Sequence, residues 1–179
     1  MKIDANGWLS GVCKLVSPNF DHRTPGTKID LLVIHNISLP PEQFHGSGIL
    51  NFFTNRLDTD EHPYYAQLQG VKVSSHFLVR RDGAIVQFVS CRQRAWHAGV
   101  SSWQGRSRCN DFSIGIEMEG SDSVPFTDRQ YAALTRLTRR LQRVYPIRSI
   151  AGHSDIAPGR KTDPGPHFDW PRYRKLTRE

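Results

Sequence analysis

The chain has 179 residues, of which 37% are hydrophobic, and a formal net charge of +7. This length suits one domain that buries roughly 70% of its unfolded surface, which excludes a wholly disordered protein. No apolar run approaches the roughly 20 residues of a membrane helix, and the first residues lack the apolar stretch of a signal peptide. We therefore expect a cytoplasmic monomer with no membrane partner.

The positive charge favours an anionic partner, and two arginine-rich segments make nucleic acid a candidate. These segments cover residues 136–143 and 172–178. Both fall on expected surface helices, where a solvated face is the simpler interpretation. The chain has no zinc-finger spacing, leucine heptads or ribonucleoprotein-type aromatic motif, so we expect no nucleic-acid partner.

The three cysteines do not predict a disulfide scaffold. Cys13, Cys91 and Cys109 form no Cys-x-x-Cys pair, and their number is odd. We expect reduced thiols that pack as small buried hydrophobes.

The first third of the chain contains one strand and one helix. Residues 1–28 are expected to be loop-like, whereas residues 29–35 form a branched apolar run typical of a buried strand. Apolar residues recur with helical spacing over 49–57, and Ser47 is a suitable N-cap. The polar stretch 58–72 predicts a loop.

A hairpin follows, and then a long loop. Residues 75–80 and 84–89 are strand-like and flank Asp82-Gly83, a dipeptide typical of tight β-turns. Residues 91–111 are expected to form a long ordered loop, and loops of this length are often functional.

The last third of the chain is predicted to contain a strand, a helix, a second strand and a final helix, in that order. Residues 112–119 alternate as a strand, Thr127 and Gln130 have capping-box spacing, and residues 147–151 and 169–177 suggest a short strand and a final helix. The apolar stripe of the capped helix consists of Tyr131, Leu134, Leu137, Leu141 and Val144. The whole chain, 1–179, is therefore expected to be one α/β domain with a central mixed sheet flanked by helices.

Five residues carry the candidate chemistry. Catalytic zinc commonly has three protein ligands and an open position for water, and His35, His153 and Asp163 would supply two imidazoles and a carboxylate. Glu117 is a candidate general base, and Lys161 is a candidate cation for a developing oxyanion.

Spacing alone does not show that these five residues meet. Considered alone, His35 is better interpreted as a partly buried structural histidine. Asp163 considered alone is better interpreted as a turn residue, because it precedes Pro164. Three further residues compete for the same roles, and they are His76, His97 and Glu119.

Six segments resemble motifs of the zinc-dependent N-acetylmuramoyl-L-alanine amidases, a superfamily that includes phage lysozyme-type amidases and peptidoglycan recognition proteins. The segments are 32–36, 75–79, 94–99, 110–117, 152–166 and 168–170. The long segment 152–166 is highly specific, and the resemblance covers about residues 8 to 176. It implies an amidase-like or recognition-protein-like α/β fold with its catalytic core over 29–179.

The resemblance also implies the roles of individual residues. It places the ligands of one Zn²⁺ on His35, His153 and Asp163, where some relatives have Cys at the third position. The catalytic acidic residue falls on Glu117, a role that phage-type members give to a Tyr, and the conserved lysine falls on Lys161. No ligand is lost here, whereas non-catalytic recognition proteins lose one.

The implied reaction is hydrolysis of the amide between (1,6-anhydro-)N-acetylmuramic acid and the L-alanine of a muropeptide, in cell-wall recycling. In the hypothesised mechanism, Glu117 takes a proton from zinc-held water and gives it to the leaving amine, while zinc and Lys161 stabilise the oxyanion. The alternative is a non-catalytic muropeptide-binding module, which need not keep the full set of residues.

A small anionic muropeptide also needs binding groups. Trp96 is a candidate wall for the sugar ring, Arg108 a clamp for a stem-peptide carboxylate, and Asn36 a hydrogen-bonding partner for the peptide. Alternatively, Trp96 packs within the loop, Arg108 is a surface arginine paired with an acidic residue, and Asn36 caps a turn. His76 and His97 are then structural or substrate-shaping rather than ligands.

Overall fold

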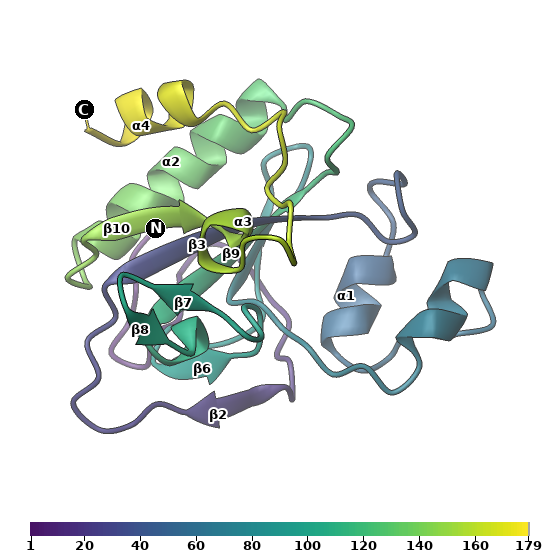
Figure 1. Cartoon of the computed structure of the whole chain (residues 1–179), viewed down its shortest axis with the longest axis horizontal. Coiled ribbons are helices and arrows are strands. Elements are labelled where there is room, and N and C mark those ends of the chain that lie inside the picture. The colour runs from purple at the N-terminus through teal and green to yellow at the C-terminus, as the bar shows by residue number, and fades with distance from the viewer. Residues whose placement is uncertain (179) are drawn as a thin grey trace.

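A six-stranded mixed sheet forms the centre of the computed structural model, which describes residues 1–178 (Figure 1). Four neighbouring pairs are parallel, and only β4 and β5 are antiparallel. In spatial order the strands are Cys13–Lys14 (β1), Ile85–Gln87 (β5), Phe77–Val79 (β4), Ser113–Glu119 (β9), Leu31–Ile37 (β3) and Ser149–Gly152 (β10).

Helices and short strands cover the two faces of this sheet. Figure 1 shows α2 and α4 on one side, with the small strands β2, β6, β7 and β8 on the other. The helices are Gly48–Phe53 (α1), Asp128–Gln142 (α2), His153–Ile156 (α3) and Trp170–Arg178 (α4), with 3₁₀ turns at Pro63–Leu68 (η1) and Cys109–Asp111 (η2). The small strands are Phe20–His22 (β2), Gln93–Ala95 (β6), Ser102–Trp103 (β7) and Arg106–Ser107 (β8). The expected single α/β domain with a mixed central sheet is confirmed.

On the central strands β3 and β9, alternate side chains face the apolar core and the candidate site. Leu32 and Ile34 of β3 and Ile116 of β9 belong to the apolar cluster that includes the buried side of α2. Since successive side chains of a strand point to opposite faces, His35 and Glu117 face the other side. The register pairs these two residues directly across the parallel strands.

The expected hairpin and helix cap are both present. Gly83 has a φ of +84° in the turn between β4 and β5, a conformation that glycine adopts without strain. Thr127 accepts a hydrogen bond from the Gln130 N–H, and the Gln130 side chain accepts one from the Thr127 N–H. The helix ends at Gln142, so Val144 lies beyond it and is 47% exposed instead of completing the buried stripe.

Several segments expected to be loops contain regular structure. Residues 1–28 are not simply loop-like, because β1 pairs with β5 and β2 pairs with β6. The segment 58–72 contains η1, and the segment 91–111 contains β6, β7, β8 and η2. These elements have two to six residues each, too few to show a hydrophobic period.

Two smaller expectations also need correction. Ser47 is the N-cap residue of α1, but its side chain makes no capping hydrogen bond. All three cysteines are free, yet Cys13 is exposed on β1, where it cannot pack as a buried hydrophobe.

Candidate active site

Two histidines and an aspartate converge at the end of the sheet. His35 lies on β3, His153 begins α3 directly after β10, and Asp163 lies in the following loop. The β3–β10 register pairs Ile34 with Gly152, so the next residue on each chain segment lies at the same edge. The His35 Nδ1 atom is 2.9 Å from His153 Nδ1 and 3.0 Å from Asp163 Oδ2, and His153 Nδ1 is 3.1 Å from the same carboxylate oxygen.

The protonation of this cluster suits a metal ion. Burial lowers the pKa of His35 to about 4, which leaves its imidazole neutral at pH 7. Burial alone raises the pKa of Asp163, but hydrogen bonds with His153 and His35 outweigh it and hold the pKa below the usual range. A neutral imidazole and an ionised carboxylate are the forms that bind metals. Two His and one Asp also match a common ligand set of catalytic divalent metal sites, so the residues fit such an ion.

Both histidines use Nδ1 toward this cluster and Nε2 toward a second partner. His35 Nε2 is 3.0 Å from Nδ1 of His97, and His153 Nε2 is 3.1 Å from the main-chain oxygen of Ala98. Metal-binding histidines commonly donate their second ring N–H to such an acceptor. The arrangement therefore has an outer layer of hydrogen bonds as well as three candidate ligands.

Glu117 lies beside the cluster and has no fixed partner. Its side chain is buried, with 7% exposed, and the residues that the structure describes offer it no hydrogen bond. Burial raises its pKa well above 4.5, and the charge of Asp163 adds to this while Lys161 opposes it. A carboxyl group with a raised pKa at a cavity wall is suited to accepting and returning a proton.

A cavity of about 450 Å³ contains these groups. One wall is apolar and comes from the loop after β3, from α1, from η1 and from the segment after η1. Seven of the eight expected site residues line the cavity, and they are His35, Asn36, Trp96, Glu117, His153, Lys161 and Asp163. The apolar wall includes Leu39, Phe52, Phe53, Leu68, Val71 and Val73, which the sequence pattern did not single out because they have the appearance of ordinary core residues.

The three expected substrate-binding residues differ in their positions. Asn36 lines the cavity, and its Nδ2 donates to Asp122 Oδ1 at 2.7 Å. Trp96 follows β6 and lines the cavity. Arg108 is outside the cavity lining, is 72% exposed, and pairs with Asp111 at 3.1 Å.

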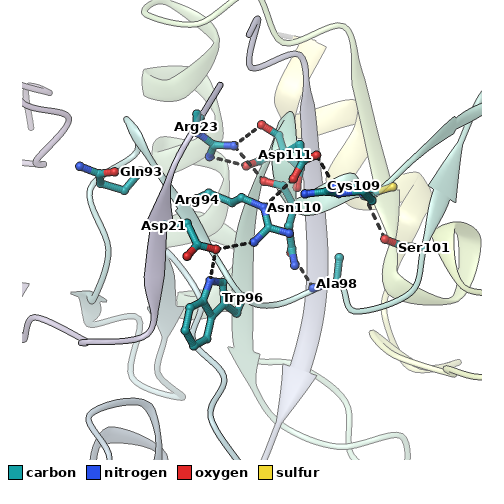
Figure 2. Close-up of polar contacts among 12 residues, drawn as sticks. Asp21, Arg23, Gln93, Arg94, Trp96, Ala98, Ser101, Cys109, Asn110 and Asp111 are labelled. Carbon is teal, nitrogen blue, oxygen red and sulfur yellow. Dashed lines mark hydrogen bonds and ion pairs between the residues drawn. The ribbon is translucent and has the colours of Figure 1, made fainter. Parts of the chain in front are cut away.

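A polar network ties the N-terminal segment to the loop that carries Trp96, His97 and Ala98 (Figure 2). Asp21 on β2 accepts the Trp96 indole N–H at 2.7 Å and also pairs with Arg94. The Asn110 side-chain oxygen accepts the main-chain N–H groups of His97 and Ala98 at 3.1 and 2.8 Å.

Arg23 is also part of this network (Figure 2). Its partly buried guanidinium donates to the main-chain oxygens of Asn110, Asp111 and Ser113 at 2.7 to 2.9 Å. Sequence reasoning missed Asp21 and Arg23, and no local signal marks them, because an arginine that binds main-chain carbonyls leaves no residue pattern. Asn110 does begin one of the segments that resemble amidase motifs.

The competing ionisable residues have structural partners. His76 is fully buried, with Nδ1 accepting the Gly115 N–H and Nε2 near the Gln93 main-chain oxygen. Burial and the charge of Arg23 lower its pKa to about 3. Glu119 accepts main-chain N–H groups from two loops and lies next to Arg80. Neither belongs to the three-residue metal candidate.

Comparison with known proteins agrees with this geometry. The family model for N-acetylmuramoyl-L-alanine amidase matches residues 25–166. The 1,6-anhydro-N-acetylmuramyl-L-alanine amidase AmpD of Escherichia coli K12 is 54% identical over 172 residues, which cover 95% of this chain and 94% of the relative.

No helix within residues 1–178 combines the length and apolar character needed to cross a membrane.

Solved structures show the same fold. A crystal structure of a selenomethionine AmpD derivative has a TM-score of 0.95 and 53% identity, covering 98% of this chain and 99% of that one. The amidase AmiD of E. coli, solved with anhydro-N-acetylmuramic acid-L-Ala-D-γ-Glu-L-Lys, has a TM-score of 0.60 and 32% identity, covering 87% of this chain and 60% of that one. The chain therefore belongs to the N-acetylmuramoyl-L-alanine amidase family and is an amide hydrolase of that class.

Proposed function

We propose that the protein is a zinc-dependent amidase that cleaves the bond between 1,6-anhydro-N-acetylmuramic acid and L-alanine in muropeptides released during cell-wall recycling. The observation that carries this proposal is one cavity that holds a His–His–Asp cluster beside a buried, unpaired glutamate. The name of the E. coli relative supports the substrate, as does the muropeptide bound to AmiD. Retention of this full set favours an enzyme over a non-catalytic muropeptide-binding module.

The metal would be held by His35, His153 and Asp163, as one Zn²⁺ per chain. When bound at such a site, zinc polarises a carbonyl oxygen and lowers the pKa of water toward about 7. The ligand geometry leaves Glu117 free, because its carboxyl group is not among the three converging atoms.

The chain's own residues then move the proton and stabilise charge. Glu117 accepts the proton of the attacking water and delivers it to the leaving amine of L-alanine. Its raised pKa suits the second step, because a carboxyl group that holds a proton readily can donate it near neutral pH. The Lys161 ammonium lines the same cavity and is placed to stabilise negative charge on the carbonyl oxygen.

Substrate binding is assigned to three residues and to the apolar wall. Trp96 provides a flat surface for the sugar ring, Asn36 bonds the peptide, and the exposed guanidinium of Arg108 clamps a stem-peptide carboxylate. Arg108 must turn away from Asp111 to do so. The monomeric state, the cytoplasmic location and the absence of nucleic-acid and membrane partners stay predictions from the sequence.

Peptide release from a defined muropeptide tests the proposal. The purified protein is incubated with anhydro-N-acetylmuramic acid-L-Ala-D-γ-Glu-L-Lys, and the tripeptide is quantified by liquid chromatography and mass spectrometry. We expect release that a chelator abolishes and that one equivalent of Zn²⁺ restores. Binding of the muropeptide without release would instead support the binding-module alternative, and release that a chelator does not affect would contradict the metal assignment.

A further inference from the structure

His97 lies between a candidate metal ligand and a serine of the central strand. Its Nδ1 atom is 3.0 Å from His35 Nε2, and its Nε2 atom is 3.1 Å from Ser113 Oγ. All three residues are buried. His97 is not one of the three converging candidate ligands, so its contact with His35 lies on the outer side of the cluster.

The direction of these hydrogen bonds follows from the ligand geometry. His35 directs Nδ1 at His153 and Asp163, so a neutral His35 that binds metal through Nδ1 carries its proton on Nε2. That N–H donates to His97 Nδ1. Because His97 Nδ1 accepts this N–H, the proton of the His97 ring is on Nε2, which donates to Ser113 Oγ.

The surroundings hold the His97 ring in this position. Gly115 lies on the same face of β9 as Ser113. A Cβ atom added to Gly115 would be 2.5 Å from His97 Cγ, so only glycine leaves room for the ring. The main-chain N–H of His97 is fixed by the Asn110 side chain. Both the ring and its backbone are thus specified by neighbouring residues.

The two candidate histidine ligands differ in their outer partners. His153 donates to a main-chain oxygen, that of Ala98, which no substitution at residue 98 removes. His35 depends on a side chain. We propose that His97 is a positioning residue that sets the tautomer and ring orientation of His35 and thereby strengthens metal binding, an inference that rests on the proposed zinc site.

Zinc affinity measured by competition with a chromophoric chelator tests this role. We expect His97→Leu to weaken Zn²⁺ binding by about 10- to 100-fold, as loss of such outer partners commonly does. His97→Asn places a side-chain oxygen near the position of Nδ1 and should recover most of the affinity. His76→Leu is the control for packing around His97, since it removes a buried imidazole that lies 5.8 Å from the His97 ring (centroid to centroid) but contacts neither histidine ligand.

Thermal unfolding of the metal-free variants separates positioning from general damage. Wild-type Zn²⁺ affinity in His97→Leu would overturn the inference, as would an equal loss in His76→Leu. If His97→Leu does not fold, Ser113→Ala replaces it, because loss of the acceptor for His97 Nε2–H should weaken Zn²⁺ binding in the same direction, and unchanged affinity would refute the role. Failure of the wild-type chain to bind Zn²⁺ would instead refute the proposed function.

Discussion

Replacing Glu117 by glutamine separates its chemistry from its packing. The two side chains have nearly the same shape, but the amide neither accepts nor returns the proton. General acid–base catalysis typically contributes about 100- to 10,000-fold, so Glu117→Gln should lower the rate of peptide release by that factor. Zinc content should be unchanged, because Glu117 is outside the three-residue cluster.

The same substitution should stabilise the metal-free fold at neutral pH. The pKa of Glu117 in the folded protein is raised well above its ordinary value of 4.5, first by burial and then by Asp163. The folded state therefore binds more protons than the unfolded state once the pH exceeds 4.5. The stability contributed by the protonated group is fully present below that pH and is lost as the pH rises through the folded pKa.

The size of this effect follows from one titrating group. Between 4.5 and the folded pKa, the free energy of unfolding of the wild type should fall by up to about 1.4 kcal/mol per pH unit relative to Glu117→Gln. Urea unfolding of both metal-free proteins between about pH 5 and pH 8 measures this difference directly. Parallel stability curves over that range would refute the buried, proton-binding environment assigned to Glu117, and near-normal turnover in a zinc-loaded Glu117→Gln protein would refute its catalytic role.

Three further variants test other parts of the site. Lys161→Ala should fold and keep zinc, but its turnover should fall by about 100- to 1,000-fold. Steady-state kinetics and zinc analysis measure both quantities, and unchanged turnover would contradict the role of Lys161 in stabilising the oxyanion. His35→Ala should lose the metal, and elemental analysis that still finds one zinc per folded chain would contradict the ligand set. Asp21→Ala frees the Trp96 indole and should raise KM by about tenfold with little change in kcat, whereas an unchanged KM would mean that Trp96 holds its position without Asp21.

The sequence predicts the strands that carry the site residues better than it predicts that these strands lie side by side. Alternation along 112–119 and the apolar run at 29–35 indicate two strands, and both are present with bounds shifted by one or two residues. Spacing does not show that these strands are parallel neighbours in a register that pairs His35 with Glu117. Strand order depends on contacts between distant segments, and only the resemblance to a family implied that His35 and Glu117 belong to one site.

Other parts of the site have no local signature. The apolar wall of the cavity comes from α1, η1 and the loops beside them, whose residues have the composition of ordinary core elements. The outer partner of His153 is a main-chain oxygen, which any residue at position 98 provides. Such contacts depend on where the backbone runs, so residue types alone do not predict them.

The N-terminal segment makes hydrogen bonds that support the loops of the candidate site. Arg23 binds three main-chain oxygens just before and within β9, and Asp21 holds the indole of Trp96. Burial lowers the pKa of Arg23 only to about 10, so its guanidinium stays charged at pH 7 while it orders the backbone next to Asn110. Asn110 in turn fixes the N–H groups of residues 97 and 98, which contact the candidate metal ligands. A chain cut at residue 28 would therefore lose part of the support of the candidate metal site.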